Sequence, residues 1–172
     1  MKFIREYGST IGILLLGAVL ILLVMLPREH PLDGQIAPTF QLAQASGGTV
    51  DLTQHIGKDV IVLDFWATWC PPCREGLPIV DAVAKHFADK PVAVYAVNIA
   101  ETPEQVKAFV DSAGLTLPVL MDDGEVATEY GVTGIPQTVV IDKAGMIHKI
   151  HVGMSGNFEA ELKAEVQSLL GS

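Results

Sequence analysis

The sequence predicts an α/β fold in which helices flank a central mixed β-sheet, preceded by one transmembrane helix. Three observations support this fold class. Residues 60–63 and 92–97 are uninterrupted runs of apolar residues, which is typical of buried strands. Residues 77–87 between them carry apolar side chains at helical spacing, so the three segments predict a strand–helix–strand unit with parallel strands. The third observation is the apolar segment of residues 7–26 at the N-terminus.

The N-terminal segment predicts a membrane anchor. Residues 11–26 contain no charged or strongly polar side chain, and the run from Tyr7 would be about 30 Å long as a helix, enough to cross a bilayer. Lys2 and Arg5 precede it, so we expect a single-pass protein of the cell membrane with a cytoplasmic N-terminus and the remainder in the periplasm or outside the cell. A cleaved signal peptide is the alternative, although residues 24–27 lack the small residues of a cleavage site.

Behind the anchor, residues 1–26, we expect a linker and one folded domain. The linker, residues 27–38, contains several proline and glycine residues and predicts an extended tether. The domain, residues 39–172, opens with two short segments that alternate apolar and polar residues around a Ser-Gly-Gly turn. These segments, residues 39–42 and 49–52, predict an N-terminal β-hairpin added to the sheet.

A further helix and strand follow the strand–helix–strand unit. Thr102 is a typical helix cap, Pro103 suits the first helical position and Gln105 completes a capping box. The helix ends at Gly114, and its predicted apolar face consists of Val106, Phe109, Val110 and Ala113. Residues 117–121 predict a strand, so this helix and strand form an inserted αβ element.

The C-terminal part predicts a second hairpin and a final helix. A short helix at residues 126–130 stops at Gly131. Residues 137–141 and 146–152 are predicted strands joined by a short turn, so we expect them to pair antiparallel. The final helix begins near Asn157, and its predicted apolar face consists of Phe158, Leu162, Val166 and Leu169.

Composition disfavours two classes of function. The formal net charge is −9, which makes nucleic acid an unsuitable partner. Two cysteines cannot complete a structural zinc site, which takes four ligands, and the five histidines show no ligand spacing. We therefore interpret His148 and His151 as ordinary strand or surface residues and expect no metal and no cofactor.

The reactive chemistry is concentrated in Cys70 and Cys73, the only two cysteines. They stand at the start of a helix, where unpaired N–H groups and the positive end of the helix dipole stabilise a Cys70 thiolate. Their spacing allows the sulfurs to close a disulfide or open as a dithiol, so the pair can store two electrons. Pro71 and Pro72 fit the first helical turn and are predicted to tune the redox potential.

The Cys-Pro-Pro-Cys sequence after a strand, followed later by Gly134-Ile135-Pro136, resembles the thioredoxin superfamily. The inserted αβ element and the N-terminal anchor resemble its membrane-anchored branch, which includes TlpA, ResA and the cytochrome c maturation thioredoxins. The resemblance covers residues 34–170 and implies a thioredoxin fold. It also implies that Cys70 is the exposed attacking thiolate and Cys73 the buried resolving thiol.

The same resemblance implies how a substrate binds. The bond before Pro136 would be cis, and the backbone at Ile135 would pair with an extended substrate segment beside Cys70. Trp69 would shield one side of the site, and the alternative for Trp69 is simple packing. The substrate-binding residues implied in this way are Trp69, Pro71, Pro72, Ile135 and Pro136.

Asp64, in the central strand, is the third catalytic candidate. A carboxylate among apolar residues has a raised pKa and can exchange a proton near neutral pH, so Asp64 is predicted to deprotonate Cys73. The alternative is a strand-end cap exposed to water. Asp64 aligns with the buried acid of ordinary thioredoxins, whereas the anchored branch more often has Asn there and a Glu three residues after the second cysteine. This sequence has Gly76 at that place, so the acid role falls to Asp64.

We therefore predict a thiol-disulfide oxidoreductase that reduces disulfides in partner proteins and is recharged by a membrane electron donor of the thiol-disulfide type. Cytochrome c maturation is one process that the resemblance implies. Two alternatives remain: an oxidase that donates disulfides to folding proteins, and a metal-binding or delivery module that uses the two thiolates. The metal alternative is disfavoured because no histidine precedes Pro136 near the cysteine pair.

Overall fold

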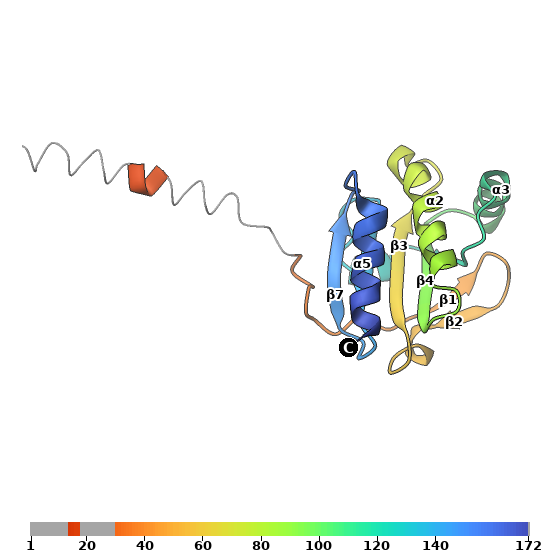
Figure 1. The fold of residues 1–172 in the computed structure, drawn as a ribbon. Coiled ribbons are helices and arrows are strands. Elements are labelled where there is room, and N and C mark those ends of the chain that lie inside the picture. The colour runs from red at the N-terminus through yellow and green to blue at the C-terminus, as the bar shows by residue number, and fades with distance from the viewer. Residues whose placement is uncertain (1–13, 18–29, 172) are drawn as a thin grey trace, which may run out of the picture.

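The computed structural model describes residues 14–17 and 30–171. Within them, a mixed sheet has the strand order β2-β1-β5-β4-β3-β6-β7 (Figure 1). The strands are β1 (Gln41–Gln44), β2 (Thr49–Asp51), β3 (Val60–Trp66), β4 (Val92–Ile99), β5 (Val119–Asp122), β6 (Gln137–Ile141) and β7 (Ile147–Val152). The helices are α2 (Pro71–His86), α3 (Pro103–Ala113), α4 (Glu125–Glu129) and α5 (Phe158–Leu170), and a 3₁₀ turn follows β2.

The predicted strand–helix–strand unit forms the centre of the sheet. β3 and β4 are parallel and joined through α2, and β6 pairs antiparallel with the other side of β3. Every residue of β3 is buried, which explains the unbroken apolar run of residues 60–63. The N-terminal hairpin and the inserted αβ element are also confirmed, since β1 pairs with β2 and with β5. The hairpin therefore joins the sheet through the inserted strand.

Helices α2 and α5 lie together on one face of the sheet (Figure 1). Because side chains alternate along a strand, Val62, Asp64 and Trp66 of β3 point to this face. Phe65 points to the opposite face, where its ring lies 5.6 Å from that of Tyr130. Asp64 is thus placed on the same side of the sheet as the helix that begins at the cysteines.

The predicted apolar faces of α5 and α3 differ in how far they are buried. All four predicted residues of the α5 face are buried. In α3, which shows the predicted capping box, Val106 is the one buried residue, while Phe109 and Val110 are half-buried and Ala113 is exposed. The prediction for Ala113 is wrong because α3 lies to one side of the sheet (Figure 1), and only part of its surface reaches the core.

The predicted membrane anchor falls outside the described residues, apart from one helical turn at residues 14–17. Among the residues that the structure describes, no helix combines the length and the apolar character needed to span a membrane.

The predicted tether, residues 27–38, departs from expectation over its described part. Residues 33–37 lie along the outer edge of β7, where Gly34 N–H donates to Ile147 O (2.7 Å) and Ile147 N–H donates to Gln35 O (2.8 Å). Ala37 is 2% exposed and belongs to the core. These residues therefore act as part of the folded domain, because backbone bonding to a sheet edge needs no apolar pattern that a sequence would reveal.

Candidate active site

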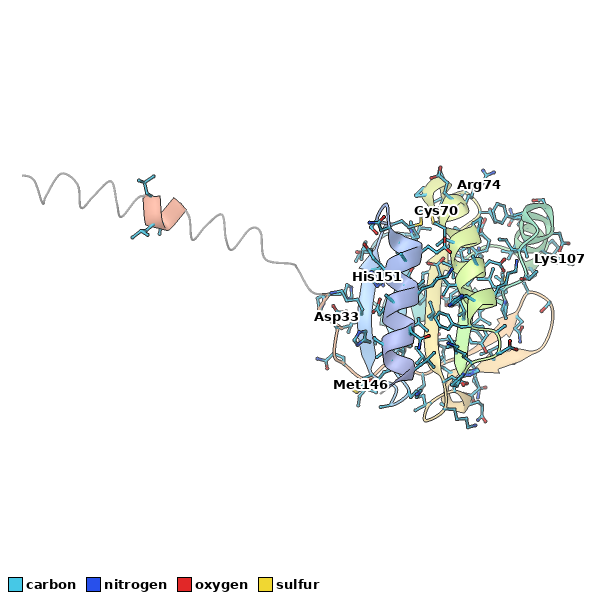
Figure 2. All side chains as sticks on the ribbon, viewed as in Figure 1. Asp33, Cys70, Arg74, Lys107, Met146 and His151 are labelled. Atoms are coloured by element: carbon cyan, nitrogen blue, oxygen red, sulfur yellow. A yellow bond between two sulfur atoms is a disulfide. The ribbon has the colours of Figure 1, made fainter. Side chains whose placement is uncertain are left out.

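The two cysteines form a disulfide at the N-terminus of α2. Cys70 is the N-cap of the helix, Pro71 and Pro72 occupy its first turn, and the Cα atoms of Cys70 and Cys73 are 5.3 Å apart. The Cys73 N–H donates to the Cys70 sulfur at 3.3 Å. Figure 2 places Cys70 and Arg74 at the end of the sheet where β3 finishes. The predicted use of unpaired helix N–H groups to hold the first sulfur is therefore present in the geometry.

Cys70 is less accessible than predicted, whereas Cys73 is buried as predicted. Cys70 is 3% exposed and Cys73 is fully buried, so the expectation of an exposed Cys70 is wrong for this oxidised form. The Ile135 carbonyl oxygen lies 3.7 Å from the Cys70 sulfur and covers it. A disulfide sulfur carries no hydrogen, so this approach is a contact rather than a hydrogen bond.

The loop opposite the disulfide has the predicted backbone. The Ile135–Pro136 peptide bond is cis, which confirms that prediction. Pro136 is buried and Ile135 is half-buried. The Pro136 carbonyl accepts a hydrogen bond from Gly153 N–H at 2.8 Å, which ties this loop to the end of β7.

Exposed apolar groups surround the disulfide. Trp69 is 69% exposed, so the alternative that it simply packs in the core is wrong. Pro71 and Pro72 are also exposed. The surface beside the disulfide therefore offers apolar contacts to a partner, as expected for a site that binds another polypeptide.

The inserted helix α3 reaches this site through Phe109. The ring of Phe109 lies 5.3 Å from the ring of Trp66 and 5.7 Å from the Arg74 guanidinium carbon. The insertion therefore contacts both the strand before the cysteines and the helix after them.

Asp64 is buried, as predicted. It is 2% exposed, and its Oδ1 accepts a hydrogen bond from the Thr138 hydroxyl at 2.7 Å. Burial raises the pKa of Asp64 to about 7, and the Thr138 hydrogen bond opposes that rise only in part. The alternative of a water-exposed strand cap is therefore wrong.

Gly76 has a steric reason to be glycine. A Cβ at this position would overlap the Met154 sulfur, which packs directly over the helix backbone. The glutamate that the resemblance places here would thus displace Met154, and the neighbouring Glu75 is exposed on α2.

Glu101 is a site residue that the sequence analysis missed. Its carboxylate accepts hydrogen bonds from Thr68 N–H (2.6 Å), from the Thr68 hydroxyl and from Asn98 Nδ2 (2.8 Å). Thr68 stands two residues before Cys70, so Glu101 fixes the loop that delivers the first cysteine. The sequence did contain a signal for this site: Thr68 and Asn98 are polar residues at the ends of two neighbouring parallel strands, which meet at one edge of the sheet.

The electrostatics of Glu101 fit this bracing role. Burial alone would raise its pKa, but the hydrogen bonds from Asn98 and Thr68 outweigh burial and hold the pKa below the ordinary value. Ala100, just before it, has a left-handed backbone with φ of 57°. Such a conformation is costly for a residue with a Cβ, so the turn that presents Glu101 is held by its surroundings.

No group of three or more His, Cys, Asp or Glu side chains within residues 14–17 and 30–171 is arranged to hold a metal ion. His148 and His151 instead flank Glu165 of α5, with His151 Nε2 at 2.8 Å and His148 Nε2 at 3.8 Å from its oxygens. The chemistry available at the site is thiol-disulfide exchange.

Comparisons with known proteins agree with this chemistry. The sequence pattern of the AhpC/TSA family matches residues 34–150. The chain is similar to thioredoxin-like protein YneN of Bacillus subtilis, at 41% identity over 137 residues that cover 78% of this chain and 79% of YneN. It is also similar to thiol-disulfide oxidoreductase ResA of the same organism, at 34% identity over 152 residues that cover 88% of this chain and 84% of ResA.

Solved structures support the same fold. A thiol:disulfide interchange protein of the thioredoxin family from Chlorobium tepidum matches with a TM-score of 0.71 at 27% identity, over 84% of this chain and 99% of that one. StoA from Bacillus subtilis matches with a TM-score of 0.65 at 26% identity, over 75% of this chain and 96% of that one. The predicted thioredoxin fold and the resemblance to ResA are thereby confirmed.

Proposed function

The chain belongs to the AhpC/TSA family and is a thioredoxin-like thiol-disulfide oxidoreductase, and from this premise we propose that it reduces disulfides in partner proteins outside the cytoplasm. The observation that carries the proposal is the placement of the pair: Cys70 caps α2 and accepts the Cys73 N–H, while the buried acid Asp64 lies on the same side of the sheet. We infer that the helix activates the Cys70 sulfur and that Asp64 serves as the base for Cys73.

The reaction consists of two exchanges. In the reduced protein, the Cys70 thiolate attacks one sulfur of the partner disulfide, forms a mixed disulfide and releases the other partner sulfur as a thiolate. Cys73 then loses its proton to the Asp64 carboxylate, and its thiolate attacks the Cys70 sulfur. The second partner sulfur leaves as a thiolate. The partner gains two electrons, and the protein is left with the Cys70–Cys73 disulfide.

The site also suggests how the partner is held. The Ile135 carbonyl beside the Cys70 sulfur is placed to accept a hydrogen bond from an extended partner segment. Trp69, Pro71 and Pro72 supply exposed apolar surface next to it. Binding would therefore depend on backbone shape and apolar side chains near the partner disulfide.

The direction of transfer separates this proposal from its alternative, donation of disulfides to folding proteins. Reduction is favoured because Asp64 stands at the place of the buried acid of the reducing thioredoxins, and the similarity to ResA points the same way. Equilibration of the full-length protein with glutathione or dithiothreitol buffers measures the reduction potential. A value near that of thioredoxin, about −270 mV, supports reduction, whereas a value near about −120 mV would establish the oxidase alternative.

Trapping tests the mechanism directly. In the Cys73→Ser variant the mixed disulfide cannot be resolved, so partner proteins should remain attached to Cys70 and separate on a reducing gel. Cys70→Ser is the matched control and should trap far less, because Cys73 has no exposed surface, whereas Cys70 keeps a small exposed part and caps the N-terminus of α2. Equal trapping by the two variants would contradict the assignment of Cys70 as the attacking residue.

Attachment to the membrane completes the proposal. The apolar N-terminal segment, residues 7–26, would hold the domain at the cell surface, where tethering raises its effective concentration near a membrane thiol-disulfide electron donor. Such a donor is needed because each turnover leaves the protein oxidised. Cytochrome c maturation is one process that this arrangement would serve.

A further inference from the structure

The proposed role of Asp64 requires a route for protons. Below its pKa of about 7 Asp64 holds a proton, and it must lose this proton to solvent before it can accept one from Cys73. Asp64 is 2% exposed and lies among apolar side chains, so direct exchange with water is obstructed. Its hydrogen-bond partner is the Thr138 hydroxyl, and Thr138 is itself 1% exposed.

The sheet register extends this contact toward the surface. Asp64 of β3 faces Thr138 of β6, and Thr138 faces His151 of β7. Residues that face one another on neighbouring strands project to the same side of a sheet, with Cβ atoms about 4.5–5.5 Å apart. The three side chains therefore form one row across three strands, and the His151 side chain, 21% exposed, is its outer end.

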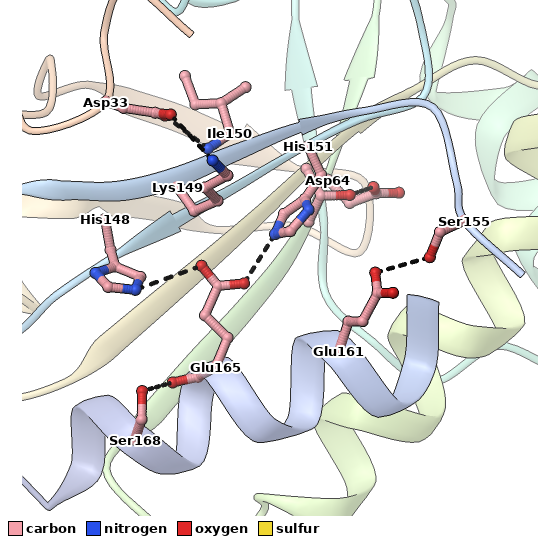
Figure 3. Close-up of polar contacts among 11 residues, drawn as sticks. Asp33, Asp64, His148, Lys149, Ile150, His151, Ser155, Glu161, Glu165 and Ser168 are labelled. Atoms are coloured by element: carbon pink, nitrogen blue, oxygen red, sulfur yellow. Dashed lines mark hydrogen bonds and ion pairs between the residues drawn. The ribbon is translucent and has the colours of Figure 1, made fainter. Parts of the chain in front are cut away.

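Helix α5 holds the outer end of the row. His151 Nε2 lies 2.8 Å from Glu165 Oε2, and the edge of the Phe158 ring packs on the imidazole with ring centroids 5.8 Å apart. Figure 3 shows the contact between the His151 imidazole and Glu165 of α5 as a dashed line. Glu165 is 12% exposed, so the row ends at the surface between β7 and α5.

We propose that Thr138, His151 and Glu165 form a proton route that connects Asp64 with solvent. This inference rests on the proposed role of Asp64 in the resolving step. The Asp64 carboxylic acid donates to the Thr138 oxygen while the Thr138 hydroxyl proton passes through one water to the imidazole of His151. The imidazolium, oriented by the Glu165 carboxylate, releases a proton to solvent.

The charged groups around His151 suit a transient positive charge. From α5 it faces Glu165, and from β3, across Thr138, it faces Asp64. On its own strand His148 lies 3.8 Å from Glu165, while Lys149 pairs with Asp33 at 3.6 Å. Imidazole is the side chain suited to passing protons near neutral pH, so the row has a histidine at the position where a relay needs one.

A single-turnover assay on the full-length reduced protein tests the route. Mixing with 5,5′-dithiobis(2-nitrobenzoate) releases one coloured thiolate when Cys70 reacts and a second when Cys73 resolves the mixed disulfide. At pH 6, burial keeps most of Asp64 protonated, and a working route returns it to equilibrium rapidly, so the second release should be a single phase. In His151→Ala and Thr138→Val, we expect part of the second release to be at least about tenfold slower. In these variants the molecules that hold a proton on Asp64 must lose it without the route before Cys73 can react.

Controls separate a proton route from a merely structural role. His148→Ala is the matched variant, since it changes the same residue type on the same strand but does not face Thr138. It should retain the single phase, as should Thr138→Ser, which keeps the hydroxyl. Added imidazole should restore the fast release in His151→Ala and leave the wild-type rate unchanged.

The outcomes distinguish this inference from the proposed function. A single fast phase in His151→Ala, indifferent to imidazole, would overturn the route while leaving the role of Asp64 intact. If Asp64→Asn also resolves at the wild-type rate, Asp64 is not the base, and both are overturned. Slow release in His151→Ala that imidazole accelerates, together with slow release in Asp64→Asn, supports both.

Discussion

At the scale of single residues, the cost of burying Asp64 is the clearest sign of function. A carboxyl group whose pKa is about 7 in the folded protein and 3.8 as a model value is harder to ionise when folded. Folding is therefore opposed at every pH at which the unfolded chain is ionised. A neutral side chain would avoid this cost, so the presence of an acid here supports the proposed proton transfer.

The stability of Asp64→Asn should depend on pH in a defined direction. Below pH 3.8 the carboxyl group is protonated in both states, so the two proteins should be equally stable. Between pH 3.8 and about 7 the unfolded state alone ionises, and the wild type should lose up to about 4 kcal/mol relative to the variant. Above pH 7 the difference should stay constant.

Urea unfolding of the two oxidised proteins at pH 4, 6 and 8 measures this difference. The comparison cancels the contributions of the other carboxyl groups, which the proteins share. If Asp64→Asn were less stable than the wild type at pH 8, this would contradict the conclusion that burial raises the Asp64 pKa.

Glu101 should matter for the loop before the cysteines. In Glu101→Gln one acceptor oxygen and the charge are lost, so the amide protons of Thr68 and Trp69 should exchange faster and stability should fall by about 1 kcal/mol at pH 7. Because hydrogen bonds lower the Glu101 pKa, the difference should shrink as the pH falls below 4.5. Hydrogen exchange followed by mass spectrometry or NMR measures the first effect.

The exposed Glu75 provides the control for Glu101. Glu75→Gln removes a nearby charge without touching Thr68, so amide exchange at Thr68 should stay at the wild-type rate. If amide exchange at Thr68 became equally faster in both variants, the loss of charge alone, and not of the contact between Glu101 and Thr68, would explain the effect on the loop.

At the scale of elements, α2 is shaped by Gly76 in its interior. Alanine normally stabilises a helix interior by about 1 kcal/mol relative to glycine, but here the new Cβ meets the Met154 sulfur. We expect Gly76→Ala to be neutral or destabilising in the wild-type background. In a Met154→Ala background the same change should stabilise by about 1 kcal/mol.

Thermal or urea unfolding of the four proteins in this cycle isolates the contact. If the effects of the two substitutions on the free energy of unfolding were additive, Met154 would be free to move away from a Cβ at position 76. The loop after β7 would then place no restriction on the active-site helix.

Most elements could be predicted from the sequence because local patterns determine them. The unbroken apolar run of β3, the capping box at Thr102 and the spacing of the α5 face all correspond to the observed structure. A bulge in the β6–β7 pair, where Val140 faces Lys149 but Ile141 faces Ile147, had no such pattern. It leaves His148 without a facing residue, so two histidines three positions apart both reach Glu165.

The site was predictable to the same extent and for the same reason. The cysteine pair, Asp64 and Pro136 belong to contiguous motifs that carry their chemistry in the sequence. Glu101 and Thr138 act through partners 33 and 74 positions away. Such contacts depend on strand order and register, and a single sequence does not encode these locally.

At the scale of the whole molecule, the domain begins before its first strand. A variant that starts at residue 39 would lose the hydrogen bonds of residues 33–37 to β7, so it should be less stable than one that starts at residue 30 by about 2 kcal/mol or more. Its uncovered β7 edge should also promote self-association. Urea unfolding and size-exclusion chromatography of the two variants measure these effects, and equal behaviour would restore residue 39 as the boundary.

Neither edge of the described sheet presents a long unpaired strand to a partner. Residues 33–37 occupy the outer side of β7, and β2 at the other edge is three residues long. An extended partner segment beside Ile135 would therefore bind across the end of the sheet instead of continuing it as another strand. It would form few backbone hydrogen bonds, so its residence time after the covalent bond breaks should be short. Weak binding of this kind suits an enzyme that acts on many disulfides and must release each reduced product.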